Sequence, residues 1–189
     1  MAASASDSFV IKTPCSSANI GPGFDVIGLG LSMYLELHVT IDRSKGKSSE
    51  PLNCRVTYEG QGEDSGGISL DPEVNLITQV AIYVLRCHDQ RAFPVETHVH
   101  IKNPIPLGRG LGSSGAAVVA GVQLGNQCGQ LNLGDDRLFD FCLMIGKYIY
   151  HVEGPSKGLT AIEISDSCEQ NATLTMLEQL FTADLSAPI

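Results

Sequence analysis

The residues best suited to chemistry form a glycine-rich segment at positions 103–115. Three glycines, Gly108, Gly110 and Gly112, alternate with other residues and precede two serines. Glycine has no Cβ, so backbone N–H groups there can approach an anion, and a helix starting at the serines adds unpaired N–H groups and partial positive charge. The segment therefore predicts a phosphate-binding loop. Its candidate ligands are Pro106, Leu107, Gly108, Arg109, Gly110, Leu111, Gly112, Ser113 and Ser114.

Spacing separates this loop from two common nucleotide-binding motifs. A Walker loop has a lysine directly before its final hydroxyl residue, and no lysine precedes Ser113. A dinucleotide fingerprint lies near a first strand and has an acidic residue about 20 positions further on, a pattern that this loop fits poorly. The Ser113 hydroxyl is a candidate ligand for phosphate or for a magnesium ion, and Arg109 is suited to neutralising charge. The alternative is a plain glycine-rich turn with a serine helix cap.

A second polar segment occupies positions 14–25, directly after a predicted strand. Asn19 offers an amide and Asp25 a carboxylate, beside the turn-forming residues Gly21, Pro22 and Gly23. Such side chains often close turns by bonding to their own backbone, and that alternative stays open for both residues.

Four short runs of residues predict the strands that must position these segments. The clearest is 35–41, in which apolar and polar residues alternate with the period of two expected of a half-buried strand. The others are 10–13, 54–58 and 95–102. The intervening segments 44–51 and 59–67 are rich in serine, glycine and charge, and we expect exposed loops there.

Three helices are expected between and after the strands. The first carries apolar residues at helical spacing from Val74 to Leu85, after Asp71 and Pro72. The second begins at Ser113 or Ser114 and is made of small residues, so another element should pack closely against it. A third is expected to begin at Asp135 or Asp136. The fold class predicted by this pattern is α+β.

Composition narrows the class of protein. With 189 residues and 43% hydrophobic content, the chain can bury one sizeable core. The net charge of −9 argues against nucleic-acid binding, which needs a basic face. No apolar run approaches the ~18 residues of a membrane span, and residues 1–8 are small and polar, so we expect a disordered N-terminus and a cytoplasmic protein. The six cysteines show no metal-binding spacing and are interpreted as buried free thiols.

Two motifs resemble those of a known family. The Pro-x-x-x-Gly-Leu-Gly-Ser-Ser loop at 106–114 resembles the phosphate loop of the GHMP small-molecule kinases, and residues 103–117 resemble the fungal homoserine kinase version. Residues 16–25 resemble the Ser-Ser-Ala-Asn-[Leu/Ile]-Gly-Pro-Gly-[Phe/Tyr]-Asp signature of homoserine kinases. The resemblance covers roughly residues 9–145. It implies ATP-dependent phosphorylation of the L-homoserine hydroxyl to O-phospho-L-homoserine, in threonine biosynthesis.

The resemblance also implies roles for single residues. Asn19 and Asp25 match the positions that hold the amino-acid substrate, with the carboxylate facing its ammonium group. Asn75 matches a position in the adenine pocket, although a local bond at a helix N-terminus is an equal alternative. Residues 106–114 would bind ATP, and Ser113 would contact Mg²⁺. No catalytic base is assigned, as in the family. Residues 9–145 would form a ribosomal protein S5 domain 2-like domain.

The family pattern stops after Ile145. Homoserine kinases continue there with a Glu-x-His-Pro-Asp-Asn segment and later a ferredoxin-like domain, whereas this chain reads Gly146-Lys147-Tyr148. Those three residues can be encoded by a string that contains an intron donor-like sequence, so we interpret 146–189 as a non-family tail from intron read-through. Without its second domain, the first should expose apolar surface. Two hypotheses remain open: an active homoserine kinase, or a truncated, inactive nucleotide-binding fragment. A homodimer is also left open.

Overall fold

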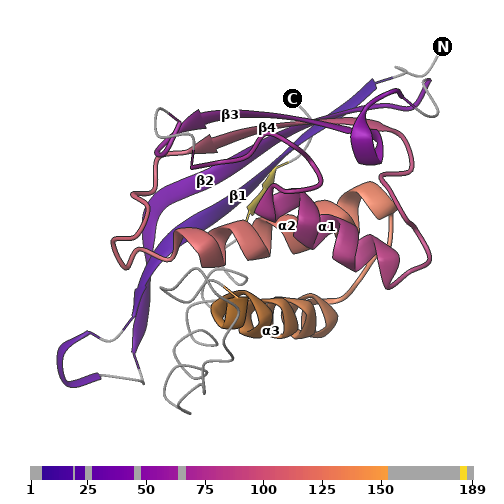
Figure 1. Cartoon of the computed structure of the whole chain (residues 1–189). Helices are drawn as coiled ribbons and strands as arrows, with labels where there is room; N and C mark the ends of the chain where they lie inside the picture. Colours follow the sequence, from indigo (N-terminus) through magenta and orange to yellow (C-terminus); the bar gives the residue numbers. More distant parts are fainter. Residues whose placement is uncertain are drawn as a thin grey trace.

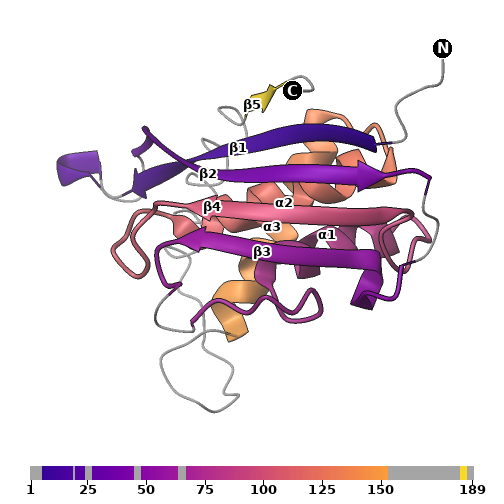
Figure 2. The ribbon, with the colours of Figure 1, turned by 90° about the horizontal axis from the view of Figure 1, so that it is seen from above.

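The computed structural model describes residues 6–18, 20–23, 27–44, 48–63, 67–152 and 184–186. They form an α+β domain in which a five-stranded sheet of order β3-β4-β2-β1-β5 carries its helices on one face (Figure 1). Seen from above, the strands lie side by side in that order over the helices (Figure 2). The strands are β1 (Ser6–Ala18), β2 (Gly28–Asp42), β3 (Cys54–Gly60), β4 (Glu96–Asn103) and β5 (Asp184–Ser186). The helices are α1 (Leu76–Arg86), α2 (Ser113–Gly129) and α3 (Asp135–Val152), with short 3-10 turns at Gly21–Gly23 and Pro51–Asn53.

The four predicted strands and three predicted helices are confirmed in type and place, but β1 and β2 extend well beyond 10–13 and 35–41, and β5 was not predicted. β1 begins at Ser6, inside the segment expected to be disordered, because Ser6, Asp7 and Ser8 pair with the end of β2. Residues 1–5 lie outside the described residues. At the other end, α3 continues past Ile145 to Val152, across the boundary expected for the family domain. None of the described helices combines the length and the apolar character needed to cross a bilayer.

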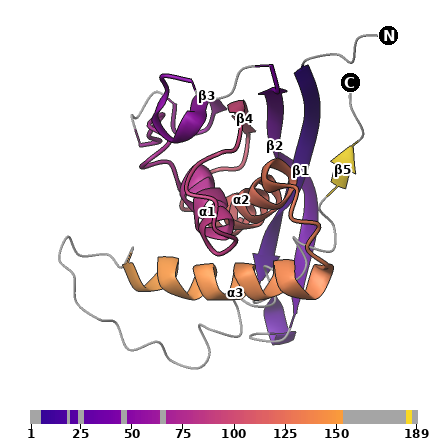
Figure 3. The same ribbon diagram turned by 90° about the vertical axis from the view of Figure 1, so that its right-hand side faces the viewer.

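The main core lies between the sheet and the pair of helices α1 and α2. The alternating residues of β2 that face the helices, Leu35, Leu37, Val39 and Ile41, are at most 2% exposed. On the other side of the helix pair, α3 packs through a second cluster that includes Val118, Val122, Phe141 and Cys142. Figure 3 shows α1 and α2 between the sheet, which curves above and to the right of them, and α3, which lies below them.

Close packing between α1 and α2 depends on glycines, as the small residues of the second helix predicted. A Cβ added to Gly121 would lie 2.7 Å from Ile77 O, and one added to Gly125 would lie 2.8 Å from Ala81 O. These contacts advance along both helices in the same direction, so α1 and α2 run parallel.

The β1–β2 hairpin is bent by an irregularity between Pro14 and Cys15. Pro14 pairs with Tyr34, but Cys15 pairs with Leu31, so β2 carries two additional residues at this point. Beyond it, residues 15–18 and 28–31 form the distal part of the hairpin, which projects past the helices (Figure 1).

Candidate functional site

The glycine-rich segment forms the connection between β4 and α2. Gly108, Gly110 and Gly112 have φ angles of 65°, 71° and 65°, in the left-handed region that favours glycine. A Cβ on Gly108 or Gly110 would meet nothing within 4 Å, so backbone conformation, and not crowding, requires glycine at these two positions. Gly112 is the N-cap of α2 and Ser113 its first residue, so a serine does not cap this helix, while the phosphate-binding role of the loop stays a prediction. The N–H groups of the first turn of a helix have no partner within it and suit an anion.

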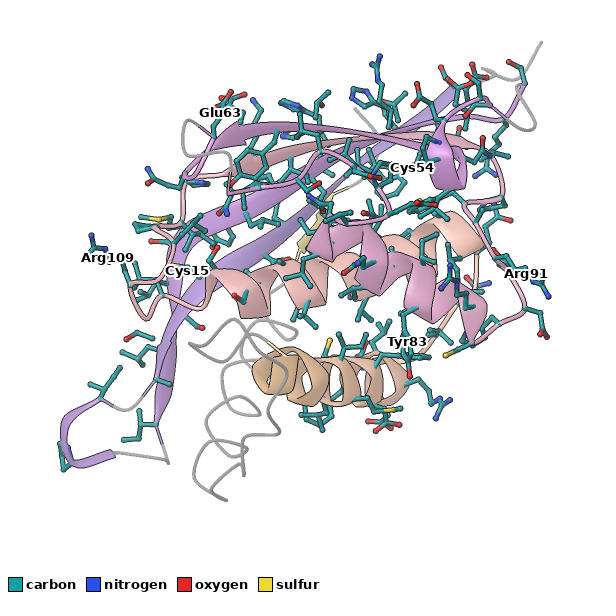
Figure 4. The ribbon with its side chains drawn as sticks, in the orientation of Figure 1. Cys15, Cys54, Glu63, Tyr83, Arg91 and Arg109 are labelled. Carbon is teal, nitrogen blue, oxygen red and sulfur yellow. The ribbon has the colours of Figure 1, made fainter. Side chains whose placement is uncertain are left out.

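Hydrogen bonds fix this loop to two strands. Asn103, the last residue of β4, accepts a hydrogen bond at Oδ1 from Ile105 N (3.1 Å) and donates from Nδ2 to Ser113 Oγ (3.2 Å). Ser16 N of β1 donates to Leu111 O at 3.1 Å. The start of the 14–25 motif and the phosphate loop therefore lie side by side, and Figure 4 shows Cys15 next to the base of the loop.

The predicted loop residues differ in exposure along the chain. Those at the tip, from Leu107 to Gly110, are exposed, and Figure 4 shows the Arg109 side chain at the outer end of the loop. Pro106, Leu111 and Ser113 are half-buried, and Ser114 is exposed. A ligand at the start of α2 would thus be accessible from solvent.

The Asn75 side chain makes two local hydrogen bonds. It is the N-cap of α1: Oδ1 accepts from Ile77 N (3.1 Å), and Nδ2 donates to Ser69 O (2.8 Å). It is 5% exposed. The local-bond alternative is therefore what the structure shows, and an adenine role for this residue stays a prediction. Ile77 lies opposite Gly121 and the two helices run parallel, so Asn75 lies level with position 119 of α2. At a rise of 1.5 Å per residue, that level is about 9 Å along the helix axis from Ser113.

Asn19 and Asp25 lie outside the described residues, so their positions are not tested. The strand that precedes them in the chain, β1, lies beside the phosphate loop at Ser16, whose N donates to Leu111 O. The neighbouring Cys15 is 1% exposed, and burial raises the pKa of its thiol, which makes it a poor nucleophile.

A magnesium ion is not supported by the described residues alone. Among them, no group of three or more His, Cys, Asp or Glu side chains could hold a metal ion. Residues 106–114 contain hydroxyl groups but no carboxylate, and Mg²⁺ is usually held through one or two carboxylates. The loop therefore fits a phosphate better than it fits a metal on its own.

Sequence reasoning missed Asn103 as a residue of this site. It is polar and only 4% exposed, and it stands between a strand and a loop rich in proline and glycine. A polar side chain at such a junction often bonds to the following turn, and that signal could have identified it.

Comparison with known proteins places the domain in a family. Residues 75–158 match the GHMP kinases N terminal domain. Over 142 residues the chain is 56% identical to the homoserine kinase of Saccharomyces cerevisiae, covering 74% of the chain and 40% of that relative. It is 55% identical over 141 residues to the homoserine kinase of Candida albicans, covering 75% of the chain and 38% of the relative. The chain spans about two fifths of the length of these relatives.

A solved structure supports the same fold. The homoserine kinase of Cytophaga hutchinsonii has a TM-score of 0.62 at 22% identity, covering 95% of this chain and 51% of that one. The resemblance inferred from the two motifs is thus confirmed. The chain contains a GHMP kinase N-terminal domain and belongs to that family.

Proposed function

We propose that this chain is the nucleotide-binding part of a cytoplasmic homoserine kinase, which transfers the γ-phosphoryl group of ATP to the hydroxyl of L-homoserine. The product would be O-phospho-L-homoserine, in threonine biosynthesis. The observation that carries the proposal is 56% identity over 142 residues to a homoserine kinase. The left-handed glycines that lead into α2 support it, since they form a backbone suited to phosphates.

Phosphoryl transfer depends mainly on positioning and on stabilising charge, so this domain needs no strong base. In the proposal, the first N–H groups of α2 and the Ser113 hydroxyl bind the phosphates of ATP. Arg109 is exposed at the loop tip and neutralises part of their charge. Asp25 binds the substrate ammonium group and Asn19 donates or accepts a hydrogen bond beside it.

Magnesium would reach this site with ATP and reduce the negative charge on the phosphates. Because residues 106–114 provide no carboxylate, we propose that this part of the chain binds the phosphates and that it does not hold the metal alone. Ser113 stays the candidate for any direct contact.

A second function is favoured for the 189-residue polypeptide taken alone: nucleotide binding without turnover. Two observations support it. The chain spans about two fifths of the relatives that it matches. The distal part of its hairpin also leaves apolar side chains exposed, including Leu29 at 48%.

The experiment compares two proteins: the 189-residue chain, and residues 1–145 continued with the remainder of a fungal homoserine kinase. ADP production is measured with ATP, Mg²⁺ and L-homoserine. We expect homoserine-dependent turnover only from the continued protein, with the short chain lower by at least roughly a thousandfold, because proximity effects alone are that large. Equal rates from the short chain and the continued protein would show that the chemistry does not need the part added after residue 145. A continued protein without homoserine-dependent turnover would exclude this substrate.

The variant Gly112→Val tests the phosphate loop in the same proteins. A β-branched residue at a φ of 65° is strained, at a cost of roughly 1–2 kcal/mol, so ATP binding should weaken about tenfold. Calorimetric titration with ATP measures this directly. An unchanged affinity for ATP would show that this loop does not bind the phosphates.

A further inference from the structure

Asn103 lies where β4 enters the phosphate loop, and its amide has a defined orientation. A backbone N–H can only donate, so the atom that accepts from Ile105 N must be the side-chain oxygen. The amide nitrogen therefore faces Ser113 Oγ, at 3.2 Å. Amide nitrogen donates and does not accept, so the Ser113 oxygen is the acceptor in this bond. The hydroxyl hydrogen of Ser113 is then left for a different acceptor.

The end of β3 holds Asn103 in this place. The backbone carbonyl oxygen of Asn103 accepts a hydrogen bond from Gln61 N at 2.8 Å. A Cβ on Gly60 would overlap this carbonyl group, so the two strands lie very close here. The Tyr58 hydroxyl donates to Gln61 O at 2.6 Å, so the residue that bonds to the Asn103 carbonyl is itself bonded to β3. Burial raises the pKa of Tyr58, so the phenol stays protonated. The Asn103 amide is thus held in place by its backbone and directs a hydrogen at Ser113 Oγ.

We propose that Asn103 is a positioning residue that turns the Ser113 hydroxyl into a hydrogen-bond donor for a phosphate oxygen of the nucleotide. The proposal rests on the proposed function and specifies how one residue of that site acts. It favours a phosphate contact for Ser113 over a metal contact, since the bond from Asn103 already occupies part of the lone-pair density that a metal would need. Asn103 itself is 4% exposed and acts through Ser113.

The decisive variant is Asn103→Asp in the 189-residue chain. The side chain keeps its shape and can still accept from Ile105 N, but the group facing Ser113 becomes an acceptor. The Ser113 hydrogen would turn toward the new carboxylate and away from the nucleotide. We expect ATP affinity to fall at least about tenfold, equally in Mg²⁺ and in EDTA, as measured by calorimetry. A loss confined to the magnesium condition would overturn the donor role and mark Ser113 as a metal ligand.

New negative charge near the phosphates would itself weaken binding, so the variant is repeated in a Ser113→Ala background. If Asn103 acts through Ser113, the loss caused by Asn103→Asp should be several-fold smaller there, because the two residues are coupled. Equal losses in both backgrounds would overturn the proposal. Asn132→Asp, which makes the same change at an exposed residue, is the matched control and should change ATP affinity by less than about twofold.

A measurement without nucleotide separates this proposal from the proposed function. The side-chain amide signals of Asn103 are recorded by ¹⁵N NMR in the unsubstituted chain and in Ser113→Ala. We expect them to shift when the acceptor is removed, and unchanged signals would overturn the link between the two residues. If the unsubstituted chain bound no ATP, the proposed function and the phosphate contact of Ser113 would both fail, while a shifted signal would still establish that Asn103 orients Ser113.

Discussion

The two parts of the β1–β2 hairpin have similar apolar residues in different surroundings. In the proximal part, residues 6–14 pair with 34–42, and Ile11 and Leu37 are fully buried under the helices. In the distal part, residues 15–18 pair with 28–31, and Leu29 and Leu31 are 48% and 37% exposed. Both parts are paired strands, so hydrogen bonding does not distinguish them. The difference shows that strand pairing can continue where a core ends, and that stability should depend more on the buried leucines of the proximal part than on the exposed leucines of the distal part.

The largest effect expected from this comparison is a difference between two leucines of one strand. Leu37→Ala removes a fully buried side chain and should lower the free energy of unfolding by about 2–5 kcal/mol. Leu29→Ala, its matched control in the distal part, should lower it by less than about 1 kcal/mol. Urea denaturation of both variants gives the two values. Similar losses would mean that the distal part belongs to the same cooperative core.

The next prediction assigns a function to the distal part, since Asp25 lies in the segment that joins its two strands. Asp25→Asn, in the continued protein, removes a charge-assisted hydrogen bond that is typically worth about 1.5–3 kcal/mol. The KM for homoserine should rise roughly tenfold to a hundredfold, with the KM for ATP unchanged.

The matched control is Asp140→Asn, which changes an exposed carboxylate on α3 and should alter neither KM. Steady-state kinetics with each substrate varied in turn gives all four values. Equal damage to the binding of both substrates by Asp25→Asn would identify that residue as structural.

The smallest of the three effects concerns the contact between α1 and α2. Gly121→Ala places a Cβ 2.7 Å from Ile77 O and 2.7 Å from the Val80 Cβ, which the two packed helices cannot absorb without moving apart. We expect a loss of about 1–3 kcal/mol, as is usual for overpacking. Gln127→Ala, at an exposed position of the same helix, should stay within about 0.5 kcal/mol. An unchanged urea midpoint for Gly121→Ala would contradict the close approach of the helices.

Much of the fold could be predicted because local pattern and final burial agree. The alternation at 35–41 and the helical spacing that ends at Leu85 reflect faces that are buried in the structure. The distal strand residues were missed because Gly28 and Gly30 favour turns as readily as strands, and their pairing is imposed by the partner strand. β5 was missed because three residues carry no periodicity, and their pairing with β1 is a contact distant in sequence.

The candidate site was predictable to a different degree at each residue. The glycines of the loop were identified because their conformational need is visible in the residue type. Asn75 shows the opposite case: its type suits either a ligand contact or a helix cap, and only the observed bonds to Ile77 and Ser69 show that the cap exists. Asn103 was missed because its importance depends on Ser113, ten residues away, across a turn whose geometry the sequence does not give. The interpretation of residues 146–189 stays a prediction.

The position of β4 has a consequence for how the chain folds as it is synthesised. β3 is followed in the chain by α1 and only then by β4, yet β4 lies between β3 and β2 in the sheet. The hairpin of β1 and β2 is complete once Asp42 has left the ribosome, whereas β3 has no neighbour until residues 96–103 follow. β4 must therefore enter between two strands that were made before it. Until then the nascent chain presents an open edge along β2, which is the kind of surface that chaperones protect from association with other chains.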